Sequence, residues 1–172
     1  GKYYGKPNLA NGESHEPGST FKLMALVAAL EDKVVDTTSV IDTKNGELTF
    51  YGKYVVRDSR RGGYGKITLS EVFERSSNTG MVQAIYNNYK SKPEQFVNRL
   101  MNMGLHETLG LPVVGEGQPK IPHPDKPGWD GLDLPWMAYG YGVSLTPMQT
   151  LAFYNAIAND GVMLRPRFLE RI

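Results

Sequence analysis

The chain has 172 residues, and its 19 basic and 18 acidic residues give a formal net charge of +1. At one domain per roughly 100–200 residues, this length predicts one domain. The hydrophobic fraction of 40% and the charged fraction of 22% exclude a disordered or collagen-like chain. The near-neutral charge gives no reason to expect a nucleic-acid partner. The absence of cysteine excludes a disulfide framework, a thiolate zinc site and a cysteine nucleophile.

The first 31 residues predict a loop followed by a buried helix. Residues 1–18 are rich in Gly, Asn and Pro, which predicts a loop. Residues 20–31 are strong helix formers and are apolar on every side, a pattern typical of a buried helix. Ser19 or Thr20 is expected to cap this helix, because a hydroxyl there can accept a hydrogen bond from a free backbone N–H.

The middle of the chain predicts a hairpin and two helices. Residues 47–57 are rich in β-branched and aromatic residues around a central Gly-Lys pair, which predicts a hairpin. Residues 44–46, Lys-Asn-Gly, predict a turn between strands. A short helix is expected near residues 69–75, and a longer one over 79–89, where apolar side chains share one face.

The last part of the chain predicts two helices on either side of a long loop. Pro93 is expected to open the first of them, since proline is favoured at the first helical position. Six prolines between residues 111 and 135 predict a surface loop without regular structure. Thr146 and Pro147 predict the start of the second helix, and residues 159–161 its end. Apolar residues line one side of that helix: Met148, Leu151, Tyr154 and Ile157.

Lys22 is anomalous because it lies one turn into the apolar helix. Burying an ammonium without a partner is unfavourable and lowers its pKa, and a neutral lysine near pH 7 is a competent general base. Ser19 lies three residues earlier on the same helix face, where the lysine nitrogen can reach its oxygen. A hydroxyl beside such a base is what covalent acyl transfer requires. The alternative is that Ser19 only caps the helix and Lys22 extends to the surface.

Residues 76–78, Ser-Ser-Asn, form a second candidate site between two predicted helices. Asn78 offers both a donor and an acceptor, which suits the binding of a peptide bond. Ser76 offers a hydroxyl that can relay a proton. The alternative is that one of these residues only caps the helix over 79–89.

Three segments resemble the penicillin-binding proteins. Residues 15–22, His-Glu-Pro-Gly-Ser-Thr-Phe-Lys, resemble their Glu-Pro-Gly-Ser-x-x-Lys box, and residues 75–80, Arg-Ser-Ser-Asn-Thr-Gly, resemble their Ser-x-Asn box. Residues 139–149, Tyr-Gly-Tyr-Gly-Val-Ser-Leu-Thr-Pro-Met-Gln, are similar to a segment typical of class B members, above all the septal, cell-division transpeptidase. The resemblance runs from about residue 9 to the end of the chain.

The resemblance implies a peptidoglycan D-Ala-D-Ala transpeptidase and assigns its roles residue by residue. Ser19 would be the acylated nucleophile, Lys22 its general base, and Ser76 the proton shuttle to the leaving group. Asn78 would hold the amide of the stem peptide or of a β-lactam side chain. Family members cleave the terminal D-Ala-D-Ala bond, release D-Ala and pass the acyl group to an amine on a neighbouring strand.

The family's third box, Lys-Thr-Gly, is not in this sequence. In the family that box lies on a strand that lines the site and supplies the second oxyanion N–H. We therefore expect residues 1–172 to form a partial transpeptidase domain of the α+β class. It would be the mainly helical lobe of the serine β-lactamase/penicillin-binding transpeptidase fold, with a small β-hairpin but without most of the central antiparallel sheet. Such a fragment is expected to acylate slowly or not at all and to self-associate through uncovered apolar surface.

Two alternative functions share these boxes. A serine β-lactamase-type hydrolase needs a deacylating carboxylate, and Glu94 lies in a segment that weakly resembles the class A box. We interpret Glu94 instead as an acid in the first turn of a helix. The second alternative is a non-catalytic β-lactam sensor or a structural domain with a relic site, although the intact Ser19/Lys22 and Ser76/Asn78 pairs argue against a relic.

The resemblance also implies ligands and a location. The ligands would be peptidoglycan stem peptides and β-lactam antibiotics, without a cofactor or a metal; the three histidines are too dispersed to predict a metal site. Cell-division or elongation proteins would be partners of the full-length protein. That protein would be anchored in the bacterial cytoplasmic membrane, with this domain on the periplasmic face. The longest apolar run, residues 23–30, is short of the ~20 residues that cross a bilayer, so the chain as given is expected to be soluble.

Overall fold

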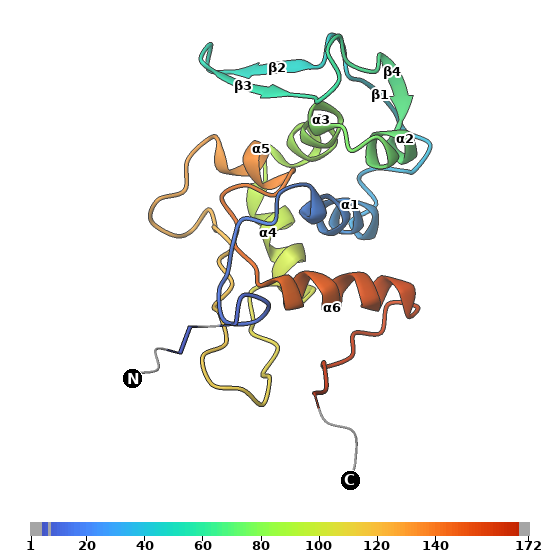
Figure 1. Ribbon diagram of the computed structural model, residues 1–172. Helices are drawn as coiled ribbons and strands as arrows, with labels where there is room; N and C mark the ends of the chain where they lie inside the picture. Colours follow the sequence, from blue (N-terminus) through green and yellow to red (C-terminus); the bar gives the residue numbers. More distant parts are fainter. Residues whose placement is uncertain (1–4, 7, 169–172) are drawn as a thin grey trace.

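Helices form the body of the molecule, and two pairs of short strands lie at one end of it (Figure 1). This computed structural model describes residues 5, 6 and 8–168. In chain order the elements are η1 (Gly18–Phe21), α1 (Lys22–Glu31), β1 (Val40–Asp42), β2 (Glu47–Phe50), β3 (Tyr54–Arg57), β4 (Lys66–Thr68), α2 (Leu69–Glu74), α3 (Asn78–Tyr89), α4 (Pro93–Asn102), α5 (Asp133–Met137) and α6 (Pro147–Ala158).

Helix α3 is the centre of the packing. It contacts α1, α2, α4 and α5 as well as strands β1 and β3. Gly80 allows α2 to approach closely, because a Cβ at this position would lie 2.6 Å from Val72 Cγ1. The helices predicted over 79–89 and from Pro93 are therefore confirmed. The largest buried apolar side chains include Phe21, Met24, Val72, Met81, Ile85, Tyr89, Phe96, Leu100 and Met137.

The strands form two separate antiparallel pairs. The β2–β3 hairpin is the one predicted over 47–57, and it pairs Phe50 with Tyr54 across the turn. The predicted Lys-Asn-Gly turn is also present, since Gly46 N donates to Thr43 O at 2.9 Å. The pairing of β1 with β4 was not predicted, because strands of three residues are too short to show an alternating pattern.

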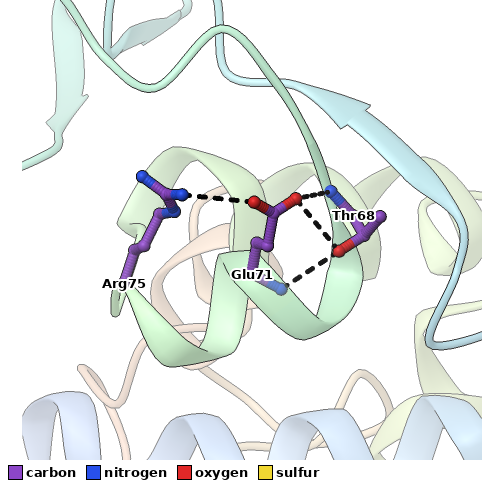
Figure 2. Close-up of polar contacts among 3 residues, drawn as sticks. All are labelled: Thr68, Glu71 and Arg75. Carbon is purple, nitrogen blue, oxygen red and sulfur yellow. Dashed lines mark hydrogen bonds and ion pairs between the residues drawn. The ribbon is translucent and has the colours of Figure 1, made fainter.

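A capping box fixes the start of α2 (Figure 2). Glu71 N donates to Thr68 Oγ1 at 3.3 Å, and the Glu71 carboxylate accepts from Thr68 N at 2.9 Å. Arg75, one turn later, donates to the same carboxylate at 3.2 Å. The hydrogen bonds from Thr68 lower the pKa of Glu71. This reciprocal cap fixes the first residue of a helix that is only six residues long.

The first helix differs from its prediction in two ways. A 3₁₀ turn, η1, precedes α1, and neither Ser19 nor Thr20 caps the helix with its side chain. Thr20 Oγ1 instead donates to Pro17 O at 2.8 Å. The helix is also not buried all round, because the α3 and α4 contacts cover one side and leave four apolar residues partly exposed. These are Leu23, Leu26, Val27 and Leu30. In the described part of the chain, no helix is long and apolar enough to span a membrane.

Helix α6 turns its predicted apolar side outward. Leu151, Tyr154 and Ile157 are 52%, 37% and 43% exposed. The buried side carries Gln149, Ala152, Phe153 and Ala156 instead. Both sides of the helix are apolar enough to face a core, so periodicity alone does not determine which one is buried.

The proline-rich segment is irregular until it reaches α5. Residues 111–132 contain no helix or strand beyond a single bridge between Lys120 and Ser144. Helix α5 begins at Asp133, inside the segment predicted to be irregular throughout. Pro135 fits there because it lies in the first turn, where a backbone N–H has no intrahelical partner.

Asp32 ties the end of α1 to α3 and α4. Its side chain is 4% exposed and accepts hydrogen bonds from the Tyr89 hydroxyl at 2.8 Å and from Arg99 Nε at 2.7 Å. Arg99 Nη2 lies 2.6 Å from the same carboxylate oxygen. Burial and the neighbouring Asp32 raise the pKa of Tyr89, which keeps its phenol protonated as a donor.

Replacing Asp32 by Ala should lower the free energy of unfolding by about 2–4 kcal/mol, because a buried hydroxyl and a partly buried cation lose their common acceptor. Urea unfolding of the variant measures this loss. Glu31→Ala, an exposed change one residue earlier, is the control and should stay within about 0.5 kcal/mol of wild type. Equal effects from both variants would contradict the role given to Asp32.

Candidate active site

Lys22 lies at the centre of the candidate site, in the first turn of α1. It is 1% exposed, as the sequence predicts. Its Nζ donates to Ser76 O at 2.6 Å, to Ser76 Oγ at 2.9 Å and to Asn78 Oδ1 at 2.6 Å. An ammonium has three N–H groups, and these three acceptors fill all of them. The structure thus joins the two candidate motifs, which are more than 50 residues apart in the chain.

Burial lowers the pKa of Lys22 from 10.5 to about 8, and the Asp58 carboxylate opposes this shift. A sizeable fraction of Lys22 is therefore neutral near pH 8. A neutral amine keeps two N–H groups and gains a lone pair, so one of its three acceptors is released and the nitrogen can accept a proton. In the Tyr-Gly-Tyr-Gly segment, burial, Tyr141 and Glu16 raise the pKa of Tyr139 to about 12, which keeps this phenol protonated.

The turn after α2 presents Ser76 to Lys22. Ser77 N donates to Val72 O and Ser76 N donates to Phe73 O, both at 2.9 Å, which is the Schellman arrangement that ends many helices. Ser76 occupies the position where glycine is usual and has a φ of +52°. A left-handed conformation disfavours a residue with a Cβ. Ser76 is thus held in a strained backbone conformation, from which both its backbone carbonyl and its side-chain hydroxyl accept hydrogen bonds from Lys22.

Residues 77–79 form the start of α3, and their side chains contact two different groups, Lys22 and Asp58. Ser77 is the N-cap of α3, because its Oγ accepts from Gly80 N at 3.0 Å, in agreement with the capping alternative for this motif. Asn78 is half-buried and bridges Lys22 to the hairpin, since its Nδ2 donates to Arg57 O at 2.7 Å. Asp58, the next residue of the hairpin, accepts from Ser77 and Thr79. Asp58 belongs to none of the sequence motifs and was not predicted as a site residue.

Ser19 is exposed and lies in η1, one 3₁₀ turn before Lys22. In a 3₁₀ turn residues i and i+3 are eclipsed, so the two side chains leave from the same face. Lys22 N donates to Ser19 O. Within residues 5, 6 and 8–168, the hydrogen bonds of Lys22 Nζ go to Ser76 and Asn78, and none goes to Ser19 Oγ. Ser19 and Lys22 thus lie on the same helix face, as predicted, but the Lys22 amine donates its hydrogen bonds to Ser76 and Asn78.

The Tyr-Gly-Tyr-Gly segment lies against the Glu-Pro-Gly-Ser segment. Gly18 N donates to Gly140 O at 3.0 Å, and Gly142 N donates to the Glu16 carboxylate at 2.8 Å. A Cβ at Gly140 would lie 2.0 Å from Gly18 O, so only glycine allows this approach. His15 and Leu145 extend the contact as a β-bridge. These contacts determine the position of the backbone that enters η1 at Ser19.

The penicillin-binding protein transpeptidase domain family model matches residues 4–172 of the chain. The chain belongs to this family. The resemblance inferred from the boxes is therefore confirmed.

Named relatives agree with the family. The penicillin-binding protein PbpB of Mycolicibacterium smegmatis is 30% identical over 96% of this chain and 24% of its own length. The peptidoglycan D,D-transpeptidase FtsI of Escherichia coli is 29% identical over 91% of this chain and 25% of its own length. The chain thus spans about a quarter of the length of the curated relatives that it matches.

The fold matches solved transpeptidase domains. The transpeptidase domain of Burkholderia pseudomallei penicillin-binding protein 3 aligns with a TM-score of 0.76 at 26% identity, over 92% of this chain and 50% of that one. The expected fold class is confirmed: the chain has the mainly helical part of the transpeptidase fold, with two small sheets among its described residues.

The strain at Ser76 can be measured with a pair of variants. Ser76→Ala and Ser76→Gly both remove the hydroxyl, but only Gly also removes the Cβ that disfavours a positive φ. We expect the Gly variant to be the more stable of the two by about 1 kcal/mol, the reverse of the usual order. Urea unfolding of both variants tests this. An Ala variant as stable as the Gly variant would show that the turn relaxes without cost.

Proposed function

We propose that this chain carries the acylation site of a peptidoglycan D-Ala-D-Ala transpeptidase that also binds penicillins covalently. Ser19 is the nucleophile, Lys22 its general base, Ser76 the proton shuttle and Asn78 the substrate-binding amide. The observation that supports this best is the buried Lys22 amine, which has a lowered pKa and is held by Ser76 and Asn78 one 3₁₀ turn from the exposed Ser19.

The proposed reaction has two steps, acylation of Ser19 and transfer of the acyl group to an amine. Neutral Lys22 takes the proton of the Ser19 hydroxyl while Oγ bonds to the carbonyl carbon of the penultimate D-Ala. The C–N bond to the terminal D-Ala then breaks, and Ser76 passes the proton from Lys22 to the leaving amine. In the second step an acceptor amine bonds to the same carbon and gives a proton to neutral Lys22. The Ser19 ester bond then breaks, and Lys22 returns that proton to Ser19 Oγ. A β-lactam enters only the first step, because its leaving nitrogen stays attached to the acyl group.

The setting of the whole protein is part of the proposal. Relatives named penicillin-binding protein and peptidoglycan D,D-transpeptidase support the activity. We assign the septal, cell-division type, with cell-division or elongation proteins as partners, on the resemblance of residues 139–149. We place the domain on the periplasmic face of the bacterial cytoplasmic membrane, with peptidoglycan stem peptides as substrates. We treat residues 1–172 as a partial transpeptidase domain. Because Lys-Thr-Gly is not in this sequence, we expect the isolated chain to acylate slowly, since loss of one oxyanion donor alone costs about 10²–10³ in rate.

The assignment of Ser19 is tested by intact mass after incubation with benzylpenicillin. The intact transpeptidase that contains this chain should gain one acyl adduct, and Ser19→Ala should gain none. Ser59→Ala removes an exposed serine outside the site and should label as wild type. An adduct on Ser19→Ala, or no adduct on wild type, would overturn the assignment. The isolated chain should label more slowly than the intact protein, and equal rates would refute its expected incompleteness.

The role of Lys22 predicts the pH dependence of acylation. The active form is the neutral amine, so the rate should be low at pH 6, rise about tenfold per pH unit, and level off above the Lys22 pKa of about 8. Stopped-flow labelling between pH 6 and 10 measures this profile. Lys22→Arg keeps a charge that cannot be removed and should be inactive throughout. A wild-type rate that does not change with pH would exclude Lys22 as the base.

The same labelling experiment separates the alternatives. A β-lactamase-type hydrolase would lose its adduct rapidly, whereas a transpeptidase or a sensor would keep it. Glu94 lies exposed in the first turn of α4, which supports a helix-dipole role for it more than a deacylating one. Release of D-Ala from a stem-peptide analogue would distinguish the enzyme from a sensor.

A further inference from the structure

We propose that Asp58 is a positioning residue of the acylation site, whose carboxylate holds the Ser76–Thr79 turn in the arrangement that binds Lys22. This inference rests on the proposed function of Ser19 and Lys22. It concerns a residue that belongs to neither of the two boxes and that lies directly after β3.

The carboxylate of Asp58 is the acceptor for the start of α3. Its Oδ1 accepts from Thr79 N at 2.9 Å and its Oδ2 accepts from Thr79 Oγ1 at 2.8 Å. Ser77 Oγ lies 3.1 Å from both oxygens. Ser77 and Thr79 are 0% exposed, so water cannot replace Asp58 as their acceptor. A carboxylate at the first turn of a helix also interacts favourably with the helix dipole.

Successive side chains of this turn contact two charged groups in alternation. Ser76 and Asn78 face the Lys22 amine, while Ser77 and Thr79 face the Asp58 carboxylate. The backbone carbonyl of Arg57, next to Asp58, accepts from the other end of the Asn78 amide. The end of β3 therefore fixes both the backbone of the turn and the orientation of the amide that Lys22 binds.

Asp58 also acts on the charge of Lys22, because its negative field raises the pKa that burial lowers. Within the described residues, the groups that accept hydrogen bonds from Lys22 Nζ are uncharged. The turn contributes the Ser76 and Asn78 oxygens, and η1 contains no charged residue. The ion pair of Arg99 from α4 with Asp32 lies at the opposite end of α1. Loss of the Asp58 charge should thus make Lys22 neutral at a lower pH.

Asp58→Asn in the intact transpeptidase tests this proposal with two readouts. We expect penicillin acylation to slow by about 10–100-fold, because the turn is less well held. We also expect the midpoint of its pH profile to move to lower pH, since the ammonium loses a nearby anion. A ¹³C NMR titration of the Lys22 side chain reports the same shift without any activity. Asp160→Asn makes the same charge change at an exposed position after α6 and should alter neither readout.

Thr79→Val keeps the charge of Asp58 and removes one hydrogen bond to it. We expect this variant to acylate more slowly with an unchanged midpoint, and it decides the matter if Asp58→Asn does not fold. Wild-type rates and midpoints in Asp58→Asn, or a wild-type rate in Thr79→Val, would overturn the proposal. If instead wild type fails to acylate at Ser19, the proposed function fails, and the Lys22 titration still measures the effect of Asp58.

Discussion

A buried ammonium is the constraint around which this structure is organised. Lys22 gives up nearly all contact with water, and each of its three N–H groups then requires an acceptor. A backbone carbonyl, a hydroxyl and a side-chain amide supply them, all from the turn between α2 and α3. That turn can supply three acceptors only because Ser76 adopts a left-handed conformation and Asn78 begins the next helix. The connection between α2 and α3 thus supplies the acceptors that the buried lysine requires.

Three distant parts of the chain converge on this arrangement. The hairpin holds the turn from the side opposite Lys22, and the Tyr-Gly-Tyr-Gly segment holds the backbone that precedes Ser19. Glycine at position 140 is needed because the carbonyl of Gly18 occupies the space of a Cβ. The motifs therefore occur together for a physical reason, because each one packs against or hydrogen-bonds to another.

Part of the fold and of the candidate site could be predicted from the sequence alone. The remaining features depend on contacts between segments that are distant in the chain. A buried Lys22, a helix cap within residues 76–78 and the helices over 79–89 and from Pro93 could be proposed from composition, spacing and proline chemistry, although the first two had alternatives that the structure was needed to decide. The 3₁₀ turn at Ser19, the outward face of α6 and the β1–β4 pair do not, because each depends on which other elements lie nearby. Asp58 could not have been found at all, since a single carboxylate after a strand carries no pattern until its partners are known.

The two ends of α1 show how the same element serves stability and chemistry. At its C-terminal end the buried Asp32 side chain pairs with Arg99 and accepts a hydrogen bond from Tyr89, which connects three helices. At its N-terminal end the buried Lys22 donates hydrogen bonds to neutral oxygens. The Asp58 carboxylate does not contact it directly and instead accepts hydrogen bonds from Ser77 and Thr79. A direct ion pair there would keep the lysine protonated and make it useless as a base. In the proposed function, the place of Asp58 behind the turn lets it order the site while burial leaves the Lys22 amine close enough to neutrality to accept a proton.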